Sequence, residues 1–328
     1  MLVRIAFLIV VTAANSFALS EETVDNEFDV SGATKLIVDV DFGNIEIVRG
    51  SDKKLGVTAY RKISANDEAQ EKEYLQATPV RIAKQGNTVS VRARREHGSS
   101  WRSSGNTSTH ARYSIRAPKE LDAELSTGGG CISGSDFSGS CKAETSGGDL
   151  KFSRLRGPIR ASTSGGKIDI EACDGAQILE TSGGRITSAG GGGHLDVRTS
   201  GGSITVNDFA GDTKVETSGG KLALDNIRGK LMGETSGGSI TARIPAPVPA
   251  DVKLETSAGR IEVAVPADAA LDLLAETSEG SVTSELPVVA KRAGRDGLQG
   301  TINGGGRSLV LRTGAGNIAI KSAGKDSN

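Results

Sequence analysis

The chain has 328 residues and a formal net charge of −1. It contains 44 Gly but only 7 Phe, 3 Tyr and 1 Trp, so a thick core built on aromatic side chains is excluded. Collagen is excluded because glycine is far below one third of the residues, and the regularly spaced apolar residues exclude a disordered chain. The balanced charge gives no electrostatic reason to expect a nucleic acid partner.

Residues 1–18 have the pattern of a secretory signal peptide. Arg4 supplies the positive charge, residues 5–11 form a short apolar run, and Ser16 and Ala18 flank Phe17 in a small-x-small cleavage site. The apolar run is far shorter than the roughly 18 residues needed to span a bilayer. We therefore expect an exported, periplasmic or extracellular protein with no membrane span after cleavage.

Residues 19–118 are expected to form an irregular, β-rich N-terminal part of the fold rather than a separate domain. Alternating apolar residues predict strands at 36–40, 45–48, 55–60, 80–83, 89–93 and 113–116. A polar start and Pro79 beyond the end predict a helical insert over residues 64–77. The segment 94–110, rich in Ser, Gly and Arg and containing Trp101, is predicted to be a loop.

The rest of the chain repeats one motif, Thr-Ser-Gly-Gly-x-Ile or a close relative, ten times. Its threonine recurs every 18 residues from Thr127 to Thr235, then at Thr256, Thr277 and Thr313. Counted from this threonine, position 4 is always glycine and position 6 is always aliphatic, and apolar residues return at positions 15 and 17. Because apolar residues two apart mark strands, each repeat is predicted to be two short strands joined by glycine turns.

Such a strand pair cannot bury its own apolar face, whereas stacked repeats form a continuous core. We therefore predict an all-β fold, a parallel β-solenoid of about 18-residue coils over residues 119–322, followed by a disordered tail at 323–328. The turn glycines are expected to adopt positive φ. A calcium β-roll is excluded because its Gly-x-Asp element is absent. A left-handed hexapeptide helix is disfavoured because position 18, which would have to be aliphatic, is usually glutamate.

The glutamates at position 18 form a column on the predicted coils. A column of carboxylates suits cation binding or glycan cleavage by paired carboxylates. We favour solvated charge pairing with residues at position 5, in the pairs Glu180/Arg185, Glu216/Lys221 and Glu255/Arg260. The column consists of Glu144, Glu180, Glu216, Glu234, Glu255 and Glu276, interrupted by Ser162, Arg198 and Arg312.

Other candidate chemistry has a structural explanation. The position-1 threonines point inward by the strand alternation, so they are expected to bond the turn backbone rather than bind ice. The Gly-Gly pairs lack the Lys-Ser/Thr of a phosphate loop, and His97, His110 and His194 have no second ligand at metal spacing. We expect no catalytic, cofactor-binding or metal-binding residues, and no cofactor.

The three cysteines occupy different faces of the predicted coil. Cys141 and Cys173 fall at inward positions and are expected to fill the core, whereas Cys131 points outward. A Cys131–Cys141 disulfide is therefore geometrically awkward.

The repeated motif resembles that of a known family, and two further segments share this resemblance. They are the entry Ala117-Pro118-Lys119 and the ending with Asn303-Gly304-Gly305-Gly306 and Asn317-Ile318. It is similar to the bacterial β-solenoid domain of unknown function labelled putative adhesin, over most of residues 28–321. The resemblance implies a repetitive parallel β fold in envelope or secreted proteins, with no catalytic site.

The sequence thus predicts a non-enzymatic, exported binding or structural module. Its expected partner is an extended polymer or a protein surface, and end-to-end self-association is an option. Two alternatives remain open: a polysaccharide-active enzyme of the β-helix type, and an envelope-stress scaffold that assembles through its coil ends.

Overall fold

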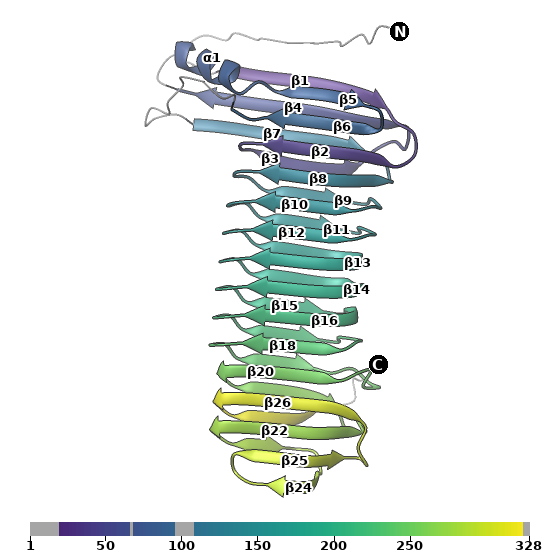
Figure 1. The fold of residues 1–328 in the computed structure, drawn as a ribbon, viewed down its shortest axis with the longest axis vertical. Coiled ribbons are helices and arrows are strands. Elements are labelled where there is room, and N and C mark those ends of the chain that lie inside the picture. Colours follow the sequence, from purple (N-terminus) through teal and green to yellow (C-terminus); the bar gives the residue numbers. More distant parts are fainter. Residues whose placement is uncertain (1–19, 66–67, 96–107, 324–328) are drawn as a thin grey trace. The chain divides into compact units, whose positions relative to one another are not determined.

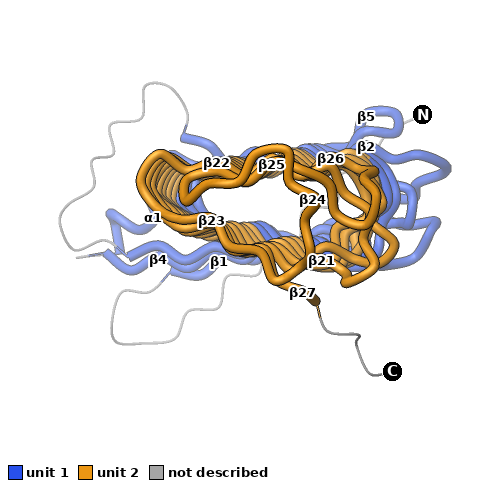
Figure 2. The backbone as a smooth tube through the Cα atoms, turned by 90° about the horizontal axis from the view of Figure 1, so that it is seen from below, with its two compact units in different colours: residues 1–157 blue, residues 158–328 orange. Residues whose placement is uncertain are grey.

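The computed structural model describes residues 20–65, 68–95 and 108–323. The chain forms two compact units, residues 1–157 and 158–328, which Figure 2 draws in blue and orange. The predicted signal peptide, His97, Trp101 and residues 324–328 of the predicted tail lie outside the described ranges, so what we expect of them stays a prediction.

Unit 1 pairs its strands in two rows. One row has the order β5–β6–β2–β8–β10, and the other has the order β1–β4–β7–β3–β9–β11. The elements are β1 (Ser20–Asp29), β2 (Thr34–Val40), β3 (Asn44–Arg49), β4 (Lys54–Ser64), α1 (Glu68–Ala77), β5 (Arg81–Gln85), β6 (Thr88–Ala93), β7 (Ser108–Ala117), β8 (Leu121–Thr127), β9 (Ile132–Ser135), β10 (Cys141–Thr145) and β11 (Leu150–Ser153).

The structure of unit 1 differs from the sequence-based expectation at three points. Strand β1 was not predicted; its mixed polar sequence pairs antiparallel with β4. The helix α1 is shorter than the predicted insert, since Ser64 is the last residue of β4. The predicted loop 94–110 is wrong at its end, because Ser108 to His110 begin β7 and pair with the end of β4.

Unit 2 is a parallel β-solenoid, as predicted. Figure 2 shows its coils superposed in projection, each a flattened loop with β22 and β26 on one long side and β21, β23 and β27 on the other. The elements are β12 (Ile159–Thr163), β13 (Ile168–Thr181), β14 (Ile186–Thr199), β15 (Ile204–Asn207), β16 (Ala210–Thr217), β17 (Leu222–Asp225), β18 (Leu231–Thr235), β19 (Ile240–Arg243), β20 (Val252–Ala258), β21 (Ile261–Pro266), β22 (Leu271–Glu279), β23 (Val282–Ser284), β24 (Val289–Ala293), β25 (Gly297–Ile302), β26 (Arg307–Ala315) and β27 (Ile318–Ala323).

The last coil of unit 2 is out of sequence order. Strand β26 lies between β20 and β22 and pairs in parallel with both, and β25 pairs antiparallel with the other edge of β22 (Figure 1). The turn from β25 to β26 must therefore cross the start of β22. A Cβ on Gly306 would lie 2.5 Å from the carbonyl oxygen of Ala270, so this close crossing requires glycine.

Core side chains alternate with outward ones as predicted. In β16, for example, Thr213, Val215 and Thr217 are buried, whereas the side chains between them are partly exposed. The position-1 threonines are buried and bond the turns: Thr199 Oγ1 donates to Gly184 O of the preceding coil (3.1 Å) and accepts from Gly202 N–H of its own coil (3.2 Å). This confirms the inward direction of the threonine column.

The glycine at position 4 adopts the expected positive φ at Gly316, with φ of 148°, but at Gly202 it is required for a different reason. Gly202 does not adopt positive φ, so that expectation is wrong for this residue. Instead, a Cβ on Gly202 would lie 1.7 Å from the carbonyl oxygen of Gly184 in the coil before it. Positive φ occurs at position 13, where Gly175, Gly193 and Gly211 have φ of 124°, 120° and 153°.

Two neighbouring glycines allow this close approach to be tested. A Cβ on Gly201 would meet Ser182 O only at 3.7 Å, an ordinary contact. We expect Gly202→Ala to lower the free energy of unfolding by about 2–3 kcal/mol or more, as overpacking against a fixed backbone does, and Gly201→Ala to change it by less than about 0.5 kcal/mol. Chemical denaturation of both variants measures the difference, and equal losses would contradict this reading of the turn.

Position 10 is a second special column in unit 2. Ala172, Gly190, Asp208 and Asn226 all adopt left-handed backbone, with φ between 50° and 70°. Asparagine, aspartate and glycine tolerate this conformation better than alanine, whose Cβ crowds the following carbonyl oxygen. Ala172 therefore carries backbone strain that its neighbours in the column avoid.

Reciprocal substitutions in this column test the strain. We expect Ala172→Gly to raise the free energy of unfolding by about 0.5–1 kcal/mol. This gain is the backbone strain that glycine relieves, reduced by the larger conformational entropy that glycine loses on folding. Gly190→Ala, where a Cβ would meet only atoms at 3.7 Å, should lower it by a similar amount. Thermal and urea unfolding report both, and two changes of the same sign would refute the assignment.

Candidate functional site: the charged groove of unit 2

The charged position-18 side chains of unit 2 form a row across seven neighbouring strands. Strand register places each beside the next, at the spacing of roughly 4.7–4.9 Å between hydrogen-bonded strands. The row, called the charged row below, runs in the order Glu180, Arg198, Glu216, Glu234, Glu255, Arg312 and Glu276. Arg312 stands inside the row because β26 is inserted between β20 and β22.

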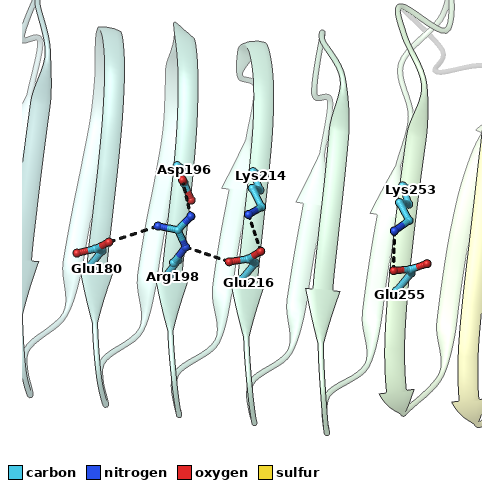
Figure 3. Close-up of polar contacts among 7 residues, drawn as sticks. All are labelled: Glu180, Asp196, Arg198, Lys214, Glu216, Lys253 and Glu255. Carbon is cyan, nitrogen blue, oxygen red and sulfur yellow. Dashed lines mark hydrogen bonds and ion pairs between the residues drawn. The ribbon is translucent and has the colours of Figure 1, made fainter.

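Arg198 links three carboxylates at one end of the row (Figure 3). Its Nε lies 2.9 Å from Glu216 Oε2 and its Nη1 3.5 Å from Glu180 Oε1, on the two neighbouring coils. Its Nη2 lies 2.8 Å from Asp196 Oδ2, two residues earlier on its own strand. Lys214 Nζ completes the group at 2.7 Å from Glu216 Oε1.

Arg312 repeats this arrangement further along the row. Its Nη1 lies 3.3 Å from Glu255 Oε1 and its Nε 3.2 Å from Glu276 Oε2. Lys253 Nζ lies 2.8 Å from Glu255 Oε2 (Figure 3), and Arg292 of β24 approaches Glu276 at 4.0 Å. These side chains are a quarter to three fifths exposed, so each pair stabilises the fold by well under ~1 kcal/mol.

The pairs keep Glu216 and Glu255 ionised. The hydrogen bond from Lys214 lowers the pKa of Glu216, with a further contribution from Arg198, against the opposing effect of burial. Partial burial acts to raise the pKa of Glu255, but Lys253 and Arg312 outweigh it and the pKa is lowered. The pKa of Arg198 is raised by its hydrogen bond to Glu216, and that of Arg312 by its hydrogen bond to Glu276.

The predicted partners of these glutamates are wrong. We expected Arg185, Lys221 and Arg260, at position 5, to pair with them. The observed partners lie on the neighbouring coil or two residues earlier on the same strand. Residues two apart on a strand share a face, whereas position 5 lies beyond the turn that ends the strand.

A row of serines at position 2 runs beside the charged row, and the two rows line an open groove. One stretch of the groove encloses about 560 Å³ and is lined by Ser162, Thr163, Ser164, Glu180, Thr181, Ser182, Arg198, Thr199, Ser200, Glu216, Thr217, Ser218, Glu234 and Ser236. A second stretch encloses about 520 Å³, and its lining includes Glu234, Arg292 and Asp296. The serine row was not predicted, although a serine follows most of the motif threonines in the sequence.

A larger hollow of about 770 Å³ lies elsewhere on unit 2, beside the proline-containing turns. Its lining mixes Asp208, Asp225, Arg228, Ile244 and Pro266. Because its chemistry changes from coil to coil, it does not offer the repeated surface that the groove does.

The remaining candidates from the sequence do not join the groove. Cys141 and Cys173 are buried and Cys131 is exposed, as predicted, and the three thiols form no disulfide. His110 lies in β7 of unit 1 and His194 in β14 of unit 2. Across residues 20–65, 68–95 and 108–323, no group of three or more His, Cys, Asp or Glu side chains is arranged to hold a metal ion. In the same ranges, no helix has the length and apolarity to cross a membrane.

Two solved structures are similar to the chain at low identity. One is a putative cell adhesion protein from Clostridium sporogenes, with 12% identity over 91% of this chain and 99% of that chain and a TM-score of 0.25. The other is a putative adhesin from Bacteroides fragilis, with 11% identity over 91% of this chain and 96% of that chain and a TM-score of 0.33. No protein of curated function matches the chain.

A family model matches residues 33–321, nearly the whole described chain. This match confirms the resemblance to a β-solenoid domain of unknown function that the repeated motif and the ending segment indicated. The chain belongs to the Toastrack DUF4097 family.

Proposed function

We propose that the protein is an exported, non-enzymatic binding module that holds an extended polar polymer along the groove of unit 2. Export is supported by the signal-peptide pattern of residues 1–18. The binding role is supported by one observation above all: the groove presents a serine hydroxyl and a charged side chain again on most of its successive coils.

A surface that repeats by translation suits a ligand that repeats by translation. Four coils of the first groove stretch each contribute a serine and a charged residue beside it, namely Ser182 with Glu180, Ser200 with Arg198, Ser218 with Glu216, and Ser236 with Glu234. Each contact with an exposed polar group is weak. Several such contacts made in register add up, because after the first contact the others form within the same complex.

The electrostatics of the groove favour binding over catalysis. A glycosidase of the usual type needs one carboxyl group with a raised pKa to protonate the leaving group. The resolved shifts in the charged row are in the opposite direction, since the pKa values of Glu216 and Glu255 are lowered. Both carboxylates are ionised at neutral pH and neutralised by their own lysines and arginines.

A bulky residue in the groove should block the polymer. Ser200 is exposed in the groove, and Thr205, partly exposed on β15, is an outward control on the opposite side of the coil. We expect Ser200→Trp to weaken binding at least about tenfold and Thr205→Trp to change it less than about twofold. Calorimetry with chitohexaose, cellohexaose, hexaserine and hexalysine measures both variants against the unchanged protein.

Two results would overturn the proposal. One is binding of these oligomers that Ser200→Trp and Thr205→Trp affect equally, or no binding of any of them. The other is cleavage of an oligosaccharide that persists through repurification and is lost on a single carboxylate substitution, which would support the polysaccharide-active enzyme instead.

A further inference from the structure

The charged row has one break in its pattern of ion pairs, at Glu234. Strand register places Glu234 directly between Glu216 and Glu255. Each of these neighbours is paired with a lysine two residues earlier on its own strand, at 2.7 and 2.8 Å. On β18 the corresponding residue is Met232, and no lysine or arginine in the described part of the chain lies within ion-pair distance of Glu234.

The break coincides with a hollow in the surface. A cavity of about 200 Å³ opens over β18, between the Lys214–Glu216 pair and the Lys253–Glu255 pair, and its lining includes Met232 and the buried Gly233. Glu234 also lines both stretches of the groove. A ligand that follows the groove past β18 therefore meets this carboxylate beside an apolar thioether.

The charge left over in this cavity belongs to Glu234. The ammonium groups of Lys214 and Lys253 are held against Glu216 and Glu255, which also accept hydrogen bonds from Arg198 and Arg312. The two arginines also bind Glu180, Asp196 and Glu276, and Arg292 lies beside Glu276. The paired side chains of the row therefore carry equal numbers of positive and negative charges, which leaves Glu234, among the described residues of the row, as the carboxylate without a counter-charge. The repeat supplies this counter-charge from inside the protein on the two neighbouring coils and omits it here.

We propose that Glu234 binds the ammonium group of a lysine side chain on an extended polypeptide lying in the groove, with the aliphatic stem of that lysine against Met232. This assignment rests on the proposed function and names its ligand class. A lysine side chain fits both features, because it carries a compact cation on a flexible chain of four carbons. The flexible, polarisable thioether of methionine adapts to such a chain.

Other cations fit the cavity less well. Calcium takes six to eight oxygen ligands, whereas here two lysines occupy the neighbouring coils and a thioether stands beside the carboxylate. An amino sugar carries its ammonium directly on a polar ring and has no apolar stem to place against Met232. A polypeptide with lysine is therefore the ligand that the cavity favours.

The repeat itself supplies the test. Met232→Lys reproduces the Lys-x-Glu pattern of the neighbouring strands and should fill the site from inside, and Glu234→Gln removes the charge. Glu180→Gln is the matched control, since Glu180 lies in the same groove but is paired with Arg198. The probes are hexalysine, hexalysine acetylated on every Nε, an oligomer of glucosamine, and calcium alone, titrated by calorimetry at two salt concentrations.

We expect Met232→Lys and Glu234→Gln each to weaken hexalysine binding tenfold or more, and Glu180→Gln to weaken it less than threefold. Hexalysine binding should fall as salt rises, and the acetylated peptide should bind weakly and equally to all variants. Circular dichroism and the unfolding midpoint verify that each variant is folded.

Three results would overturn the inference. The first is hexalysine binding that is equal in Met232→Lys and the unchanged protein. The second is binding of the glucosamine oligomer that is weakened by Glu234→Gln while hexalysine binding is not, and the third is calcium binding that is lost in Glu234→Gln. If, in these cases, some oligomer binds the unchanged protein and loses its binding in Ser200→Trp, the inference about Glu234 fails and the proposed function stands. If no oligomer binds the groove, both fail.

Discussion

The stacking of coils at the distance of hydrogen-bonded strands is the constraint on which the rest of unit 2 depends. At this distance the turn of one coil lies on the turn of the next, and Gly202 brings its Cα so close to Gly184 O that a Cβ has no room. Thr199 and Thr217 then tie the turns together through their hydroxyl groups. The residues of the repeated motif make this contact between turns: the threonine forms the hydrogen bond, and the glycine leaves room for the neighbouring backbone.

The same constraint organises the surface. Since each coil is in register with the next, a residue type that recurs in the repeat becomes a row in space, and the groove follows from the serine and glutamate positions alone. Like charges would repel along such a row. Arg198 and Arg312, two departures from the repeat, each bind carboxylates on both neighbouring coils and relieve this repulsion. On β18 the residue two before Glu234 is Met232, not a lysine as on β16 and β20, and this leaves a carboxylate available.

The threading of the last coil adds a constraint of its own. Because β26 and β27 lie between earlier coils, β20 and β22 reach their final pairing only when the C-terminal residues are in place. The Asn303-Gly304-Gly305-Gly306 turn makes this crossing possible: Asn303 Nδ2 donates to Ala267 O and Ala269 O, both at 3.0 Å, and Gly306 passes closely over Ala270. The Asn303-Gly304-Gly305-Gly306 part of the ending segment that resembles the family thus forms the turn that passes over the start of β22.

The sequence by itself determined most of the strands, the inward threonines and the buried Cys141 and Cys173, because each of these follows from local alternation with a period of two. Its composition determined that no thick aromatic core forms. It did not determine which residues meet across coils. The arginine partners of Glu180, Glu216 and Glu255, the insertion of β26 beside β20, and the backbone contact that requires Gly202 all arise from lateral pairing between residues 18 or more positions apart. Periodicity states that coils stack, but only the tertiary structure decides their order and which side chains that order brings together.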